Sequence, residues 1–346
     1  MLKRLALPCV ISSLTTSLLG CGASDTDDAP ARPNVLRLTD PRLELPQKFS
    51  QVGLYTGAAL PPAFLDAPRP ALPYEPGYPL WSDGGDKYRA IVLPEGASID
   101  ASDRKNYVFP VGTLIFKTFA YKTPNSPDDA VPVETRLLRL RDDGWELGAY
   151  GWADDASDAE LLDLKQTRTR DVLGRDGQVV AHAIPNRLDC RQCHESSANE
   201  VLGITELQLV KSGSLSKLGS AVDPQPSAPY AALPQHGPLT TAVLGYFVGN
   251  CVHCHNGGNG AASSFDLRPD VALANLIDQP TTSSATADGP RVAPGKPDES
   301  ILFLGVQGGS ALEVKDMPPV GVALRDTDAV QLLKDWISAL GTDDDP

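Results

Sequence analysis

This sequence has little to stabilise its fold covalently. It contains only six cysteines in 346 residues, and four of them lie in two Cys-x-x-Cys-His motifs at 190–194 and 251–255. The other two, Cys9 and Cys21, lie in the N-terminal segment. Because no cysteine is left for a structural disulfide, the fold has to depend on its packed core. The four remaining thiols are therefore expected to serve chemistry.

The two motifs predict covalent attachment of two haem c groups. In a Cys-x-x-Cys-His sequence the thiols add to the haem vinyl groups, and the histidine ligates the iron. The predicted residues are Cys190, Cys193 and His194 for haem 1, and Cys251, Cys254 and His255 for haem 2. Zinc is the competing hypothesis, because two Cys-x-x-Cys pairs can form a four-thiolate site. The histidine after each pair favours haem.

The N-terminus lacks an apolar run long enough to span a bilayer, since Leu5 to Leu19 is short and interrupted by hydroxyl residues. With Lys3 and Arg4 before it, this run is typical of a secretory signal. Residues 18–21, Leu-Leu-Gly-Cys, resemble the bacterial lipobox, which implies a lipoprotein signal peptide at 1–20 and lipidation of Cys21. A plain signal peptide cut nearby is the alternative.

Small, acidic and proline-containing residues at 21–34 predict a flexible tether after the signal. The resemblance to lipoproteins, with Gly22 after the cysteine, implies export. The protein would then be lipid-anchored at the periplasmic face of the outer membrane or at the cell surface.

Basic residues are scarce, with 30 Lys and Arg against 44 Asp and Glu, which gives a net charge of -14. This charge disfavours binding to nucleic acid or to anionic membrane surfaces. It favours a basic protein as redox partner, although an acidic surface kept for solubility is the alternative.

Residues 35–218 are predicted as a β-rich domain that ends with the first haem motif. Strands are expected at 88–94, 112–121, 131–141, 145–152 and 178–184, with a hairpin turn at 142–144 and a helix at 202–218. Within 131–141 the apolar parity switches at Leu137-Leu138, which predicts a bulge or an edge strand. The strands together predict an antiparallel sheet or sandwich.

The distal side of haem 1 is left open by the sequence. His182 and His236 are candidate ligands, and a surface or hydrogen-bonded role is the alternative for each. An iron without a distal ligand would permit chemistry beyond electron transfer.

Residues 219–238 contain five prolines and are predicted as a linker. In 239–342, apolar residues at helical spacing lead into Cys251, and Asp326 or Thr327 caps a terminal helix. These features and Met317, which is followed by two prolines, resemble the class I cytochrome c fold. The resemblance implies an all-α cytochrome c domain in which Met317 is the second axial ligand of haem 2.

The sequence also resembles the cytochrome P460 family, in which a lysine is cross-linked to haem. The resemblance lies in the strand at 109–117, in the Asp-Gly-Trp hairpin, and in a Cys-x-x-Cys-His motif that comes late, after the strands. Lys117 and Lys122 lie near that strand, and no flanking motif assigns the role to either.

The lipobox, the two haem motifs and the Met-Pro-Pro segment together resemble the bacterial di-haem c-type cytochrome lipoproteins, over about residues 70–340. The implied fold class is α+β. An N-terminal antiparallel β-sheet or sandwich domain with a haem motif at its end would be followed by an all-α class I-like cytochrome c domain.

The expected function is electron transfer in the periplasm or at the outer membrane, without a catalytic residue. The alternative is a peroxidase-like or P460-like oxidoreductase with an open iron at haem 1 and haem 2 as its electron supply. A haem-bearing binding lipoprotein is a third hypothesis.

Overall fold

The computed structural model describes residues 40, 42–52, 71–195, 200–258, 265–281, 288–308 and 314–340. Residues Pro33–Pro346 form one compact unit. The predicted signal peptide and tether, including Cys21, lie outside the described residues. In the part of the chain that is described, no helix is both long and apolar enough to cross a bilayer.

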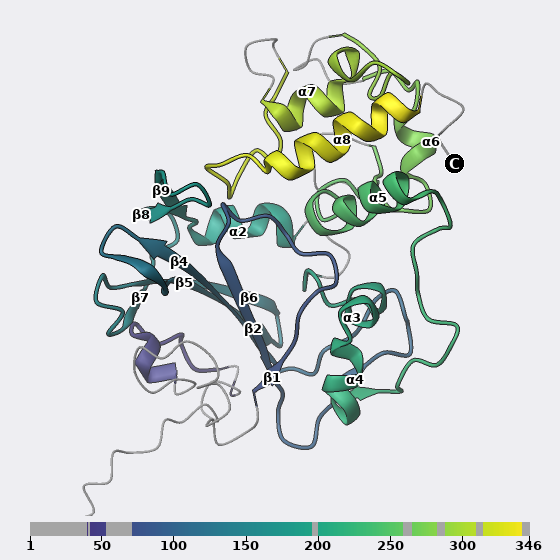
Figure 1. Cartoon of the computed structure of the whole chain (residues 1–346). Helices are drawn as coiled ribbons and strands as arrows, with labels where there is room; N and C mark the ends of the chain where they lie inside the picture. Colours follow the sequence, from purple (N-terminus) through teal and green to yellow (C-terminus); the bar gives the residue numbers. More distant parts are fainter. Residues whose placement is uncertain are drawn as a thin grey trace, which may run out of the picture. The chain divides into compact units, whose positions relative to one another are not determined.

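The largest element of this unit is a six-stranded antiparallel sheet, with the strand order β1-β2-β4-β5-β6-β7 (Figure 1). Its strands are β1 (Leu72–Pro73), β2 (Asp86–Val92), β4 (Leu114–Thr123), β5 (Ser126–Arg141), β6 (Gly144–Trp152) and β7 (Ala159–Leu161). The remaining strands form a hairpin of β8 (Arg168–Leu173) and β9 (Val179–Ile184), and a short parallel pair of β3 (Ile99–Asp100) and β10 (Val222–Asp223). The expected strands are therefore present, and Asp142 and Asp143 make the hairpin turn, after which β6 begins at Gly144 with a φ of 120°.

The prediction of an edge position or a bulge at Leu137-Leu138 is wrong. β5 lies between β4 and β6, and both leucines pair in regular register with β4. The apolar parity switches in the sequence because both faces of this strand are buried, so apolar residues occur at odd and at even positions. The register does shift further along, opposite Phe119 and Ala120, where Val133 is the extra residue.

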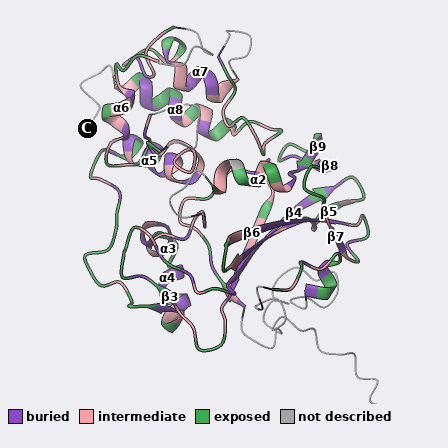
Figure 2. Cartoon of the chain, turned by 180° about the vertical axis from the view of Figure 1, so that it is seen from behind, coloured by how far each residue is buried: buried purple, intermediate pink, exposed green. Residues whose placement is uncertain are grey.

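The two faces of the sheet are covered by different parts of the chain, and Figure 2 shows the central strands buried. One face packs under η1 (Phe49–Val52), where Phe49 contacts Phe116, Tyr150 and Trp152 edge-on. The other face, through Ile115 and its neighbours, packs against the segments that carry the first motif and the following helices.

The helices follow the sheet in the chain. They are α2 (Arg187–His194), α3 (Glu206–Ser212), α4 (Ser214–Leu218), η3 (Gly219–Ala221), α5 (Pro238–Asn250), α6 (Ala272–Leu276), η4 (Pro297–Glu299), α7 (Ile301–Gln307) and α8 (Thr327–Ala339). The single helix expected at 202–218 is two helices, because Gly213 adopts a left-handed φ of 74° between them. The predicted α8 cap is confirmed, since Asp326 accepts a hydrogen bond from the Ala329 amide at 3.2 Å.

The predicted fold class, a β domain followed by an all-α class I-like cytochrome c domain, is wrong. Strand and helix are almost equal over the described residues, at about 27% and 26%. The helices at 238–340 have a buried cluster of their own, between Leu233 and Ile337, but it is not closed off from the rest of the chain, because Tyr78 and Leu207 pack against it. The predicted linker at 219–238 and the other domain boundaries are tested by no feature of the structure and stay predictions.

Residues 77–87, called here the connecting segment, explain why the helices do not separate. A Cβ on Gly249 of α5 would lie 2.8 Å from the carbonyl oxygens of Tyr78 and Pro79, so helix and segment touch backbone to backbone. The Trp81 amide donates to the Asn250 side chain at 2.7 Å. Because the segment then continues into β2, it joins the helices to the sheet.

Candidate functional site

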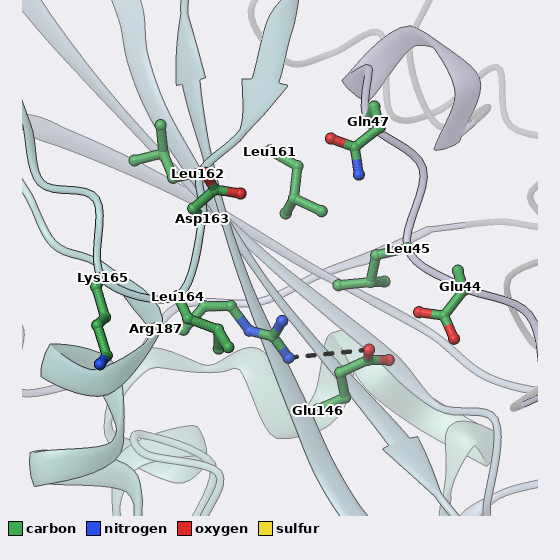
Figure 3. Close-up of a pocket in the computed structure, with 10 residues that line it drawn as sticks. All are labelled: Glu44, Leu45, Gln47, Glu146, Leu161, Leu162, Asp163, Leu164, Lys165 and Arg187. Carbon is green, nitrogen blue, oxygen red and sulfur yellow. Dashed lines mark ion pairs between the residues drawn. The ribbon is translucent and has the colours of Figure 1, made fainter.

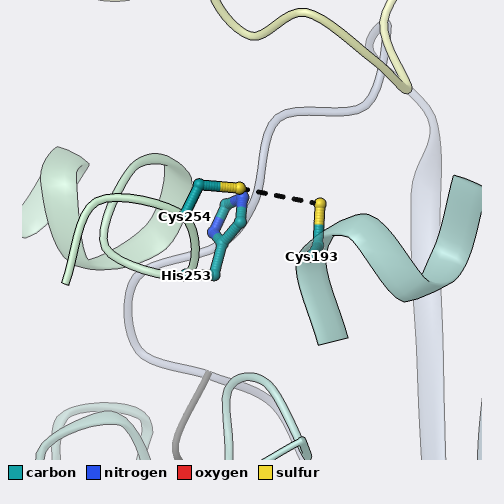
Figure 4. Close-up of side chains that lie close together, drawn as sticks. All are labelled: Cys193, His253 and Cys254. Atoms are coloured by element: carbon teal, nitrogen blue, oxygen red, sulfur yellow. Dashed lines mark hydrogen bonds between the residues drawn. The ribbon is translucent and has the colours of Figure 1, made fainter. Parts of the chain in front are cut away.

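The two Cys-x-x-Cys-His motifs meet in the folded chain, although 61 residues separate them. The Sγ atoms of Cys193 and Cys254 lie 3.9 Å apart and share a hydrogen bond. Figure 4 shows Cys193 on a helix facing Cys254, with the His253 ring beside them. One ligand atom from each of these three residues lies within 4.8 Å of the others. The meeting point is a cluster of soft ligands, and the sequence pattern did not predict the part of His253.

The first motif lies on α2, which begins at a capping box. The Asn186 side chain accepts from the Leu188 and Asp189 amides, and the Asp189 carboxylate accepts from the Asn186 amide. This cap fixes the start of a helix that is only eight residues long. Cys190 is then buried against the sheet, while Cys193 lies one turn further on at the meeting point.

The His194 ring is neutral and is held through one of its nitrogens. Its Nδ1 lies 2.5 Å from the Glu200 carbonyl oxygen, so Nδ1 carries the proton that is donated. Burial lowers the pKa of His194 to about 4, which keeps the ring neutral near pH 7. In a neutral ring with a protonated Nδ1, the Nε2 lone pair is available to a metal, as in most metal-ligating histidines.

The second motif continues α5 for one more turn. The amides of Cys254 and His255 donate to the Cys251 carbonyl at 3.1 and 2.9 Å, so the motif residues occupy a helical turn. The His255 ring packs on Phe265 with centroids 4.4 Å apart. Burial lowers the pKa of His255 and raises that of the Cys251 thiol to about 12.

None of the four motif cysteines forms a disulfide bond in the described part of the chain. The hydrogen bond between Cys193 and Cys254 raises the pKa of Cys193 and lowers that of Cys254, so one proton is held on Cys193. Three soft ligand atoms are fewer than the four of a closed zinc site. Each motif places two thiols and an adjacent histidine on a helical turn. Because this arrangement is present twice, it fits covalent attachment of haem better than one shared zinc ion.

His182 is held between two carboxylates inside the protein. Its Nδ1 lies 3.4 Å from Asp83 Oδ2, and its Nε2 lies 3.5 Å from Glu134 Oε1. Burial lowers the pKa of His182, but these two partners outweigh burial and raise it. A ring that lies between two carboxylates and is stabilised in its charged form is a poor iron ligand, although its Nε2 has no hydrogen-bond partner among the described residues.

Sequence reasoning missed the carboxylates that engage His182. Asp83 also accepts hydrogen bonds from the amides of Ala323 and Leu324, and Glu134 is paired with Arg136 at 2.7 Å. The available signal was the pair of opposite charges, Glu134 and Arg136, within a predicted strand.

The other nominated residues lie apart from this network. His236 is exposed, before α5. Met317 is half-buried on the loop between α7 and α8, and its amide donates to the Gly305 carbonyl at 3.0 Å. The structure therefore anchors the Met317 loop to α7, and ligation by Met317 stays a prediction. Lys117 is half-buried in β4, and Lys122 is exposed on the same strand.

A cavity of about 640 Å³ lies beside the start of α2 (Figure 3). It is lined by Glu44, Leu45, Gln47 and residues 161–165, together with Glu146 and Arg187, whose charged groups are 4.0 Å apart. No cysteine or histidine is among the described residues that line it.

Both motifs thus form their expected helical turns, and their sulfurs meet at Cys193 and Cys254. His194 has the hydrogen bond and the neutral ring that an axial ligand needs. Comparisons with protein-family models, with curated proteins and with solved structures find no match to this chain, so the site itself has to carry the functional assignment.

Proposed function

We propose that this chain is a di-haem c-type cytochrome that transfers electrons. Cys190 and Cys193 would hold haem 1, and Cys251 and Cys254 would hold haem 2. The observation that carries the proposal is the 3.9 Å separation of the Cys193 and Cys254 sulfurs. Two haems attached there would have neighbouring edges, which is the requirement for electron exchange between them.

Haem c would supply a one-electron ferric–ferrous couple. In the attachment itself, each thiol adds across a vinyl double bond, the sulfur bonding to one carbon and the proton going to the other, so no oxidant is needed. His194 would ligate through Nε2, since its Nδ1 is engaged with the Glu200 carbonyl. His255 would be the corresponding ligand of haem 2, and its ring is held by Phe265.

Three further parts of the proposal rest on sequence. Met317 would be the second axial ligand of haem 2, Cys21 would carry a lipid anchor, and the exported protein would exchange electrons with a basic partner at the outer membrane or in the periplasm. The loop that carries Met317 is held at Gly305 and, further on, by Asp83, which supports its use as a fixed ligand loop.

A second candidate function is an oxidoreductase with an open iron at haem 1. The observation that favours it is the position of His182 between the Asp83 and Glu134 carboxylates, together with the exposure of His236. With neither histidine ready to ligate, the distal side of haem 1 would accept an external ligand.

The test of the leading proposal is the intact mass of the full chain made in a host with a haem c attachment system. We expect a mass increase of two haems, and one haem in each of two double variants, Cys190→Ala/Cys193→Ala and Cys251→Ala/Cys254→Ala. A protein with unmodified thiols and bound zinc would refute the proposal.

Carbon monoxide distinguishes the two candidate functions. Rapid binding to one ferrous haem would favour the oxidoreductase, and the absence of binding would favour the electron carrier. His182→Gln is the matched variant, because it should leave the spectrum unchanged if His182 is not a ligand.

A further inference from the structure

The sheet face that meets the first motif carries three ordered rows of side chains. Across β2, β4 and β5 these rows are Ile91–Ile115–Leu138, Arg89–Lys117–Arg136 and Lys87–Phe119–Glu134. Residues directly opposite each other on neighbouring strands have Cβ atoms about 5 Å apart. The middle row, called here the cation row, therefore places three positive side chains side by side on adjacent strands.

The cation row is short of negative partners. Arg89 is only 9% exposed, Lys117 is half-buried, and neither makes a hydrogen bond or an ion pair through its side chain among the described residues. Arg136 pairs with Glu134, but that carboxylate is also engaged by His182. Burial and the neighbouring cations Arg89 and Arg136 lower the pKa of Lys117, and a bound anion would favour its charged form again.

Two contacts with the Phe119 ring fix the direction of the row. Lys117 Nζ lies 4.5 Å and the Arg136 guanidinium 4.4 Å from the ring centroid. The two cations are thus held over one aromatic side chain on the face that packs towards α2. Their positions are set before any ligand arrives.

The first motif lies directly beside the cation row. Cys190 packs with Ile91, Ile115 and Leu138, which form the neighbouring row of the same face. The proximity is also electrostatic, because Lys117 and Arg136 add to burial in lowering the pKa of His194. A group attached to Cys190 would therefore lie next to the three cations.

We propose that the cation row binds the propionate carboxylates of the haem attached at Cys190 and Cys193. This inference rests on the proposed function, since it requires haem 1. Haem carries two propionates, and arginine binds a carboxylate through a fork of parallel N–H donors. The two arginines at the ends of the row, Arg89 and Arg136, match two carboxylates in number, with Lys117 between them.

The experiment measures the reduction potentials of both haems in the full-length, haem-loaded protein. Arg89→Gln and Lys117→Met each remove one positive charge, which favours the ferric state. We expect the potential of haem 1 to fall by about 59 mV, which is a tenfold change in the equilibrium constant between its ferric and ferrous states. The potential of the other haem should be unchanged. Lys117→Arg keeps the charge and is expected to keep the potential.

Lys122→Met is the matched control, because Lys122 lies on the same strand, is exposed, and is outside the cation row. It should leave both potentials unchanged. A loaded protein in which Arg89→Gln and Lys117→Met shift neither potential overturns this inference alone. A protein whose mass shows no haem at Cys190 and Cys193 overturns the proposed function and the inference with it.

A free oxyanion is the other source of negative charge for the row. Inorganic sulfate is therefore titrated into the loaded wild-type protein. If sulfate shifts one haem potential and Arg89→Gln abolishes the shift, the row is open to solvent anions and the propionate assignment is wrong. The absence of a sulfate effect supports it.

Discussion

Asp83→Ala is expected to destabilise the protein strongly, because Asp83 joins the connecting segment to the loop before α8. Its carboxylate is 1% exposed and accepts hydrogen bonds from the backbone amides of Ala323 at 2.9 Å and Leu324 at 2.7 Å. It also lies 3.4 Å from Nδ1 of His182. Asp83 itself adopts a left-handed φ of 50°, which aspartate tolerates better than alanine does.

The magnitude follows from these two effects. Each hydrogen bond to the charged acceptor contributes about 1.5 kcal/mol, at the low end of the usual range because Ala323 is exposed and water replaces part of the loss. Placing alanine in the left-handed region adds about 1 kcal/mol. The free energy of unfolding should therefore fall by about 4 kcal/mol, whereas Asp83→Asn, which keeps an acceptor oxygen, should cost about half as much.

Asp278→Ala is the matched control. Asp278 has almost the same φ of 54°, is exposed, and makes no side-chain hydrogen bond in the described part of the chain. Its replacement by alanine should therefore lower the free energy of unfolding only by the cost of placing alanine in the left-handed region, about 1 kcal/mol. Urea unfolding followed by circular dichroism measures all three variants. Equal losses for Asp83→Ala and Asp278→Ala would refute the role assigned to the carboxylate.

Three other substitutions test separate parts of the fold. His182→Gln should lower the free energy of unfolding more near pH 6 than near pH 9. Because the pKa of His182 is raised in the folded protein, its contribution to stability is complete below about pH 6.5 and is lost as the pH rises through the folded-state pKa. Urea unfolding at both pH values measures the difference, and a larger cost at high pH contradicts the prediction. Gly249→Ala should lower the melting temperature, because the new Cβ would lie 2.8 Å from two carbonyl oxygens of the connecting segment. Alanine itself favours helix over glycine by about 1 kcal/mol, so a raised melting temperature would show that this contact is loose. Arg139→Met should lower the free energy of unfolding, measured by chemical denaturation, by about 3 kcal/mol, because Arg139 is fully buried and paired with the largely buried Glu146. Arg141→Met is the control at a partly exposed position on the same strand, and it should cost under about 1 kcal/mol.

Much of the sheet could be predicted from the sequence, because β-branched and aromatic runs and the Asp-Asp-Gly turn are local signals. β5 shows where local signals fail. A strand buried on both faces has no solvent side, so Leu137 and Leu138 looked like a change of face when they are regular neighbours on a central strand. The burial of Arg139 on the same strand could not be predicted either, because it depends on the ion pair with Glu146 on β6.

The chemistry of the site could be read from the spacing of the cysteines, but its assembly could not. The contact between Cys193 and Cys254 depends on how α2 and α5 are placed by the sheet and the connecting segment, and no spacing rule reports that. Asp83 was overlooked because Ser-Asp-Gly is a common turn sequence, and only the fold shows which amides its carboxylate meets.

The burial of Cys190 has a consequence for the order of events when this protein is made. Its thiol is covered by the sheet and is 7% exposed, and Cys193 already faces Cys254 across 3.9 Å. On the proposed function, an attachment enzyme that must hold the motif and a haem together could not reach Cys190 once α2 has docked. Cofactor attachment would then precede docking, and the apolar row beside Cys190 would close over a haem already in place.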